Sequence, residues 1–481
     1  MNSLKSPTLF QALIPVIILI ILLAINVIIF KDNTLAGANQ IVLLLTAAVA
    51  GVISIRLNVS WDKLLNAINK SISIAMPSVL ILLIIGSLAG TWLISGIIPV
   101  MIYYGLQIIH PSVFLFTAIV VCGIISLITG SSWSTIATVG IALLGIGKTL
   151  GINEGLVAGA IISGAYFGDK MSPLSDTTNL ASAVAGTDLF THVRYMTITT
   201  GPSIFIALII FLVLGFIKDY CMVETNIESV LMTIGRSFSL NPFLLMVPAI
   251  LIFIIVKKVP ALPSLLIATL LGAVAALIFQ PALIRQLAGE GISQLKASYI
   301  VVMRAMFGET QIVTSDKTIN DLLSTGGMAG MLYTVWLIIS AMVFGGVMEA
   351  GGLLKRITMA VISFAHSTGS LIAATITTCI FFNITASDQY LSIVVPGRMF
   401  SQTFKDKGLK PEVLSRTLED AGTLTSVLVP WNTCGATQAK VLGVPTITYL
   451  PFCFFNLINP VIAIIIGYAN FKIRRIHDNK K

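Results

Sequence analysis

Long apolar runs separated by short polar breaks dominate the chain. Residues 71–147 contain no Asp, Glu, Lys or Arg. A stretch of that length cannot form the surface of a soluble domain, and several windows reach the roughly 20 apolar residues that a membrane-spanning helix needs. The apolar positions run continuously and do not alternate with period two, which disfavours a β-barrel. The pattern therefore predicts an all-α polytopic membrane protein.

The breaks in hydropathy divide the chain into short and long helical segments. We expect these at residues 8–30, 38–56, 73–95, 97–109, 111–130, 132–147, 153–172, 195–217, 241–256, 259–279, 328–350, 353–365, 368–384, 390–400, 412–438 and 445–471. Several segments are too short to cross a bilayer alone. We therefore expect about 11 to 13 crossings together with broken or re-entrant pieces.

Composition supports this class of protein. Charged residues make up 10% of the chain and apolar residues 56%, whereas ordinary soluble domains contain about 25% charged residues. The net charge of +9 comes from short loops and the C-terminal tail, where basic residues orient a membrane protein, so no nucleic acid is expected as a partner. The five cysteines are scattered without metal-ligand spacing and are interpreted as packing residues.

The distribution of Lys and Arg predicts the orientation. The basic loops lie at 56–70, 257–258 and 355–356, and the tail adds Lys472, Arg474, Arg475, Lys480 and Lys481. These segments are expected in the cytoplasm, whereas the mixed-charge loop at 218–240 suits the outside. Both termini of this multi-pass protein are then cytoplasmic.

The two halves of the chain show a weak internal repeat. Gly96 and Gly352 lie 256 positions apart, as do Thr129 and Thr385, and the segment TGSSWSTIATVG aligns with TASDQYLSIVVPG. By the charge pattern the first repeat starts inside and the second outside, so the repeats run in opposite directions. Inverted repeats with helices interrupted at matching places are typical of secondary transporters.

Four parts are predicted from this pattern. These are N-terminal transmembrane helices at 1–70, a first inverted repeat with the ion-site motifs at 71–194, linking helices and an extracellular loop at 195–327, and a second inverted repeat with a cytoplasmic tail at 328–481.

Polar residues gather at the breaks of the first repeat. The run from Gly130 to Thr135 places hydroxyls inside an apolar segment, which indicates an unwound helix facing a cavity; close helix packing is the alternative explanation. The run from Gly164 to Asn179 sets two carboxylates, an amide, four hydroxyls and a proline together. Such hard oxygen ligands suit a hard cation such as Na⁺. A solvated loop in which Asp176 caps a helix is the alternative, and Lys170 is interpreted as a neutralising neighbour.

The second repeat offers matching polar segments around Asp388 and from Glu419 to Thr437, with Asn432 and Thr433 opposite the Leu174–Asp176 segment. Arg416 could pair with Glu419 in a purely structural role. The candidate substrate- or proton-binding residues are Asp169, Asp176, Asp388, Asp420 and Glu419. The candidate Na⁺ ligands are Ser131, Ser132, Ser134, Asp176, Asn179 and Thr425. The four histidines, His110, His192, His366 and His477, are placed at loop edges.

Three motifs carry a resemblance to a known family: GSSWST at 130–135, GAYFGDKMSPLSDTTNLAS at 164–182 and LEDAGTLTSVLVPWNTCGA at 418–436. The chain resembles the NhaC-type sodium/proton antiporters over nearly its whole length. The resemblance implies a bacterial plasma-membrane antiporter that exchanges cytoplasmic Na⁺ for external H⁺. It also implies two inverted repeats with re-entrant hairpins, no cofactor, and transport by some members of malate against lactate.

Competition between Na⁺ and H⁺ for a buried carboxylate is compatible with that function, because burial disfavours the charged carboxylate and a bound cation favours it. The exchanging carboxylates are expected to be Asp169 and Asp176. The main alternative is an antiporter of a small organic acid or another solute with coupled H⁺ and Na⁺. An intramembrane enzyme is disfavoured because the chain has no HExxH or GxSxG motif, and a passive channel is disfavoured by the repeats. Expected partners are the lipid bilayer, Na⁺, H⁺ and, in the alternative, an organic acid; a homodimer is compatible with the sequence.

Overall fold

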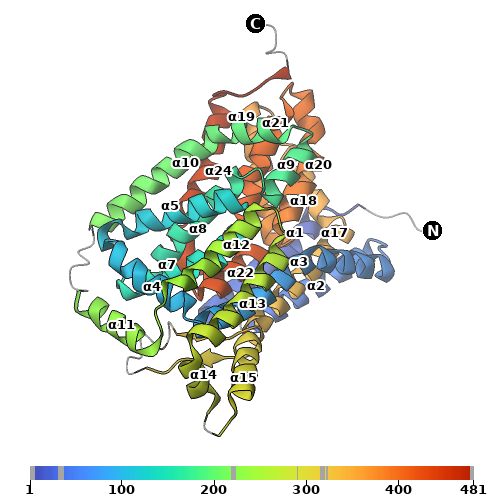
Figure 1. Cartoon of the computed structure of the whole chain (residues 1–481). Coiled ribbons are helices and arrows are strands. Elements are labelled where there is room, and N and C mark those ends of the chain that lie inside the picture. The colour runs from blue at the N-terminus through green and yellow to red at the C-terminus, as the bar shows by residue number, and fades with distance from the viewer. Residues whose placement is uncertain are drawn as a thin grey trace.

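A computed structural model describes residues 6–30, 37–217, 224–289, 291–314, 320 and 323–476. This part is almost entirely helical (Figure 1) and contains one small antiparallel sheet, formed by β1 (Thr310–Gln311) and β2 (Ser324–Thr325). Eight of the described helices are long and apolar enough to cross a membrane, or up to ten if each of two bent helix pairs is one span. The all-α polytopic class is confirmed. The expected 11 to 13 crossings also counted polar and broken helices, which this criterion leaves out.

We group the elements by the four predicted parts, with two changes of boundary: the first repeat is taken to begin with α3, at residue 61, and to include α10, most of which was predicted as a linking helix. The first holds α1 (Leu9–Phe30) and α2 (Ala38–Arg56). The first repeat holds α3 (Trp61–Ile94), α4 (Ile97–Ile108), η2 (Pro111–Val113), α5 (Phe114–Thr129), α6 (Ser132–Thr135), η3 (Ile136–Gly140), α7 (Ile141–Thr149), α8 (Glu154–Met171), α9 (Asp176–Ala185) and α10 (Leu189–Ile217). The linking group holds α11 (Glu224–Ser237), η5 (Pro242–Leu245), α12 (Met246–Val256), α13 (Ala261–Phe279), α14 (Pro281–Ala288), α15 (Gln294–Phe307) and the sheet. The second repeat holds η6 (Ala329–Met331), α17 (Leu332–Ala350), α18 (Leu353–Ile362), α19 (Thr368–Thr385), α20 (Gln389–Asp406), α21 (Pro411–Leu418), η7 (Glu419–Thr423), η8 (Ser426–Leu428), α22 (Thr433–Leu442), α23 (Thr446–Tyr449), η9 (Leu450–Phe452) and α24 (Phe454–Tyr468).

Most helices of one repeat have a counterpart at the matching place in the other. A left-handed glycine, Gly96 in one repeat and Gly352 in the other, precedes α4 and α18 at φ of 82° and 69°. Further along, a left-handed residue lies in the break after α5 and in the break after α19, directly before the N-cap residue of the next helix. These residues are Gly130 (φ 68°) and Ser387 (φ 58°). The corresponding pairs are α3 with α17, α4 with α18, α5 with α19, α6–α7 with α20, α8 with α21, α9 with α22, and α10 with α24.

Matching helices of the two repeats run in opposite directions. Along α3 and α17, Gly346 packs against Ala67 and Ile68, whereas Gly86 packs against Gly327, so residue numbers rise on one helix as they fall on the other. The pair α10 and α24 behaves in the same way, because the Phe211 and Phe454 rings lie 5.0 Å apart while Tyr195 Oη donates to the Lys472 carbonyl at 3.1 Å. The inverted topology predicted from the charge pattern is therefore present.

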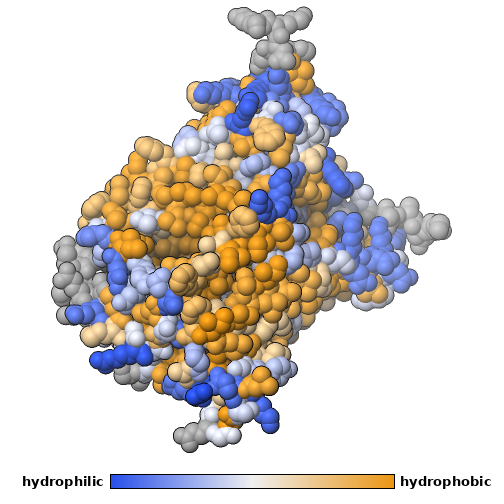
Figure 2. Space-filling model, in the orientation of Figure 1, coloured by the Kyte–Doolittle hydropathy of each residue, from blue (hydrophilic) through white to orange (hydrophobic). Residues whose placement is uncertain are grey.

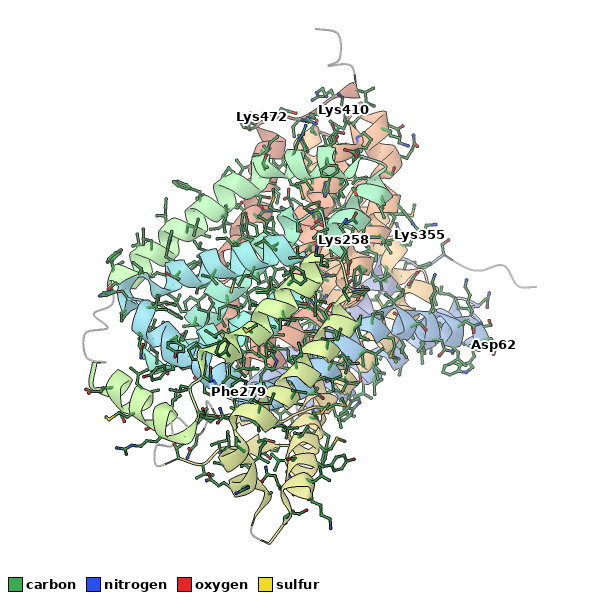
Figure 3. The ribbon with its side chains drawn as sticks, viewed as in Figure 1. Asp62, Lys258, Phe279, Lys355, Lys410 and Lys472 are labelled. Atoms are coloured by element: carbon green, nitrogen blue, oxygen red, sulfur yellow. The ribbon has the colours of Figure 1, made fainter. Side chains whose placement is uncertain are left out.

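The surface separates into an apolar flank and polar ends. Figure 2 shows hydrophobic residues over most of the visible flank, along α5, α10, α12 and α13, and hydrophilic residues gathered toward the ends of the bundle. In Figure 3, Asp62, Lys355, Lys410 and Lys472 lie around the top and right of the molecule, whereas Phe279 lies at the other end of α13 from Lys258. We call the top and right of this view the basic end; Lys258 lies at the end of α13 that is nearer to it.

Close helix packing fixes the position of α8, which carries the candidate site residue Asp169 and its neighbour Lys170. Gly164 lies against the Ile119 backbone and Gly168 against Gly123 of α5, and Ser126 Oγ donates to the Ala165 carbonyl at 2.6 Å. Small residues allow such close approach between membrane helices. As a result, the C-terminal end of α8 is held beside the break that follows α5.

Candidate ion-binding site

The first break of the site lies between α5 and α6. Gly130 adopts a left-handed conformation at φ 68°, and a Cβ atom there would lie 2.7 Å from the Leu174 carbonyl carbon. Ser131 then caps α6 by accepting a hydrogen bond from the Ser134 amide at 3.2 Å. Glycine is required here both for the backbone conformation and for the close approach of the second break.

The second break lies between α8 and α9. It runs through Ser172, Pro173 and Leu174 to Ser175, which occupies the N-cap position of α9. Between the two breaks lies a cavity of about 500 Å³, whose walls include residues of both breaks together with Lys258 and Tyr390. Because Lys258 belongs to the basic end, the cavity faces that end.

Asp169 is the most enclosed carboxylate of the cavity. It is 6% exposed, and its Oδ2 accepts a hydrogen bond from Ser132 Oγ at 2.6 Å. Asp176 and Asn179 also line the cavity, but both are exposed, and Asn179 Nδ2 donates to the Pro173 and Ser175 carbonyls. Asp176 is the first residue of α9 rather than its cap. The predicted ligands Ser131 and Ser134 line the same cavity.

Asp388 has a different environment. It is fully buried and caps α20, because its Oδ1 accepts hydrogen bonds from the Tyr390 amide at 2.9 Å and the Leu391 amide at 3.0 Å. Its neighbours Gln389 and Tyr390 line the cavity, whereas Asp388 is not among the lining residues. Thr425 is likewise buried away from the cavity, where its hydroxyl accepts a hydrogen bond from Asn383 Nδ2 at 2.9 Å.

A buried charge cluster lies behind α8. Lys170, which is fully buried, forms an ion pair with Asp420, and Asp420 Oδ1 also accepts hydrogen bonds from Thr199 at 2.9 Å and Asn459 at 2.8 Å. Arg416 Nε lies 3.5 Å from Asp420 Oδ2. Lys170 is thus the specific partner of one carboxylate. The suggested pairing of Arg416 with Glu419 is not present, because Arg416 faces Asp420.

Glu419 stands apart from the other carboxylates. Its side chain is fully buried, and neither carboxylate oxygen has a hydrogen-bond partner. Lys170 and Asp169 lie within electrostatic reach, and the hydroxyls of Thr423 and Thr177 are close neighbours. The site residues therefore divide into a cavity group and a buried group. The cavity group is Ser131, Ser132, Ser134, Asp169, Asp176 and Asn179. Ser132 belongs to it through its hydrogen bond to Asp169. The buried group is Asp388, Glu419, Asp420 and Thr425.

Two residues near the candidate site, His192 and Gln389, were not predicted from the sequence to lie there. His192 was placed at a loop edge, which is wrong, since it is fully buried and shares a 2.7 Å hydrogen bond with Ser415 Oγ through its Nδ1. His110 and His366 are exposed as expected, and His477 lies outside the described residues. Gln389 reaches both the cavity and the Cys434 thiol, which donates to its Oε1 at 2.7 Å. Gln389 directly follows Asp388 in the interrupted polar segment, and this position could have identified it as a candidate site residue.

Inverted repeats, interrupted helices and a carboxylate buried among apolar helices beside a cavity are together typical of a secondary transporter. The Na⁺/H⁺ antiporter family model matches residues 164–471. The chain belongs to this family, so it is an antiporter and not an enzyme, and its resemblance to NhaC-type proteins is confirmed.

Curated relatives align along most of the chain. The Na⁺/H⁺ antiporter NhaC of Alkalihalophilus pseudofirmus is 35% identical over 90% of each chain. The malate-2H⁺/Na⁺-lactate antiporter of Bacillus subtilis is 36% identical over 98% of this chain and 96% of its own. The arginine/ornithine antiporter ArcD of Halobacterium salinarum is 34% identical over 98% of this chain and 93% of its own. Relatives of similar identity are thus named for different cargo.

Proposed function

We propose that this protein exchanges cytoplasmic Na⁺ for external H⁺ across the plasma membrane by alternating access. The observation that carries the proposal is Asp169, a nearly buried carboxylate that faces a cavity between two helix breaks and accepts a hydrogen bond from Ser132. The relatives named NhaC support the same exchange. A carboxylate in this position can be neutralised by a proton or by a monovalent cation.

Na⁺ and H⁺ compete at this site, with Asp169 as the principal exchanging group. The hydroxyls of Ser131, Ser132 and Ser134 supply hard oxygen ligands of the kind that suit Na⁺. Asp176 lies exposed on the cavity wall, where its charge attracts cations entering from the cytoplasm. Because the site is charged when empty, reorientation is favourable only after an ion has bound, which couples the two gradients.

The orientation follows from the basic end. Positive loops prefer the cytoplasm, so the end that carries Lys258, Lys355, Lys410 and Lys472 is assigned to the inside. The cavity then faces the cytoplasm, and both termini lie there. Loading of Na⁺ from inside agrees with this assignment.

A second candidate function is exchange of a small organic solute with coupled ions. The observation that favours it is the cavity volume of about 500 Å³, which falls in the range of roughly 300–1,000 Å³ typical of small-molecule sites and exceeds what a bare Na⁺ fills. The malate/lactate and arginine/ornithine relatives support a solute as well. Lys258 on the cavity wall offers a positive group to an organic anion.

One experiment separates the two functions. Inside-out vesicles with an acid interior, followed by a pH-sensitive dye, receive Na⁺, Li⁺ or K⁺ alone, or Na⁺ with malate, lactate, arginine or ornithine. Rapid loss of the pH gradient with Na⁺ alone supports Na⁺/H⁺ exchange. A response that requires an organic solute overturns it in favour of the second function.

A further inference from the structure

The Glu419 carboxylate has an environment that the proposed exchange at Asp169 does not explain. Both oxygens are buried and without a hydrogen-bond partner, on a one-turn π-helix, η7, within the second repeat. An ionised carboxylate sealed from water without hydrogen bonds costs far more free energy than the protonated acid does. Single π-helical turns occur frequently at functional positions. This position therefore favours a carboxyl group that holds a proton.

Two hydroxyl groups connect this carboxyl group to the cavity. Ser175 Oγ and Thr177 Oγ1 are hydrogen-bonded to each other at 3.1 Å, and both residues line the cavity. Thr177 is a close neighbour of Glu419, and Ser175 is a close neighbour of Asp169. A hydroxyl can accept one proton while donating another. The order Asp169, Ser175, Thr177, Glu419 therefore offers a route for a proton between the cavity and the sealed site. Its middle link is a hydrogen bond, and its two outer links are close approaches that must shorten for a proton to pass.

The surrounding charges link the two ends of this path. Lys170 and Asp169 of α8 both act on Glu419 electrostatically. Asp420 follows Glu419 on η7, and Arg416 precedes it on α21. Of the other helices packed against η7, α9 carries Asp176 and α20 carries Arg398, Lys405 and Asp406. His192 on α10 lies close to Lys170 and Asp420, whereas the neighbouring helices α19 and α24 contain no charged residue. A cation bound at Asp169 disfavours a further positive charge nearby. Na⁺ at Asp169 and a proton on Glu419 therefore oppose each other.

We propose that Glu419 is a separate proton-binding site of the antiporter, loaded and emptied through Thr177 and Ser175. When Na⁺ binds at Asp169, the Glu419 proton passes to Thr177 as the Thr177 proton passes to Ser175 and the Ser175 proton leaves to water in the cavity. The reverse transfers reload Glu419 after Na⁺ has left on the other side. This inference rests on the proposed Na⁺/H⁺ exchange and adds to it a second residue, beside Asp169, that carries a transported proton.

Two transport modes measured on the purified full-length protein in liposomes test this assignment. One is ²²Na⁺ uptake driven by a pH gradient, and the other is exchange of ²²Na⁺ for unlabelled Na⁺ at equal pH, which needs no proton. Glu419→Gln is expected to lose at least tenfold in pH-driven uptake while Na⁺/Na⁺ exchange stays within about twofold of wild type. Asp169→Asn is expected to lose both modes. Glu412→Gln, on the neighbouring helix, is the matched control and should retain both.

A second pair of variants tests the path without changing a charge. Thr177→Val keeps the shape of the side chain but removes the hydroxyl, so pH-driven uptake should slow at least fivefold with Na⁺/Na⁺ exchange preserved. Thr177→Ser restores a hydroxyl and should restore pH-driven uptake. A wild-type protein without pH-driven Na⁺ uptake would overturn the proposed function itself. If wild type is active and either Glu419→Gln or Thr177→Val keeps full pH-driven uptake, only the Glu419 assignment is wrong.

Discussion

Asp169 and Lys170 are adjacent in the chain but face different parts of the molecule. Asp169 accepts a hydrogen bond from Ser132 beside the cavity, whereas Lys170 is buried in an ion pair with Asp420. Successive residues of a helix point about 100° apart, so the last turn of α8 presents one charge to the cavity and the opposite charge to the second repeat. This arrangement joins the cavity to the buried cluster through a single helix end.

The two cavity carboxylates should respond differently to neutralisation. Asp169→Asn removes the enclosed charge, and we expect at least a tenfold loss of Na⁺-dependent dissipation of the pH gradient. Asp176→Asn removes an exposed charge on the cavity wall, so the half-saturating Na⁺ concentration should rise severalfold with the maximal rate largely kept. Dye-based vesicle assays over a range of Na⁺ concentrations measure both effects. Equal losses in the two variants would contradict the distinction between a binding and an attracting carboxylate.

Breaking the Lys170–Asp420 ion pair should strongly lower the stability of the protein. Asp420→Leu leaves Lys170 buried without its partner, which should cost about 3–5 kcal/mol. Because Arg416 remains nearby, the double variant Lys170→Met/Asp420→Leu should recover only part of that loss. Thermal unfolding in detergent gives the comparison. Our account of the pair fails if the double variant is no more stable than Asp420→Leu.

Two left-handed glycines give a matched test of the helix breaks. Gly130→Ala adds a Cβ atom against Leu174 at φ 68°, whereas Gly186→Ala meets nothing within 4 Å at φ 78°. The backbone conformation alone should cost each variant about 1–2 kcal/mol. Only Gly130→Ala should also push the two breaks apart, so it should be less stable in thermal unfolding and lose transport. Indistinguishable variants would show that the close approach of the two breaks is unimportant.

Cysteine labelling can check the side to which the cavity opens. In a background with the native cysteines replaced, Ser131→Cys and Asn179→Cys should react with a membrane-impermeant thiol reagent added from the cytoplasmic side. Thr425→Cys should stay protected, because Thr425 is buried away from the cavity. Faster reaction from the outside would reverse the orientation that we assign to the basic end.

The sequence predicted the class and the inverted repeats, and it singled out polar residues that line the cavity. Ser132 and Asp169 could both be assigned to the candidate ion site from the sequence. Each lies in a polar interruption of an apolar run, and such interruptions are visible in the hydropathy pattern. The partner of Lys170 could not be predicted in the same way. Asp420 lies 250 residues further along, and its choice of Lys170 depends on how α8 packs against the second repeat. The burial of His192 could not be predicted for the same reason, because its partner Ser415 lies in a segment remote in the sequence.

The correspondence between the helix breaks of the two repeats also indicates how the entrance on the opposite face of the transporter would be built. If the repeats exchange conformations, the segment from Ser387 to Thr433 takes the place now held by the segment from Gly130 to Asp176. The N-cap residue Ser175 then corresponds to Asn432, and the first helical residue Asp176 corresponds to Thr433. An outward-facing entrance built from these counterparts has no acidic residue where the present entrance has Asp176. Under that exchange the two faces would differ in their attraction for cations, and cations would be collected preferentially from the basic end.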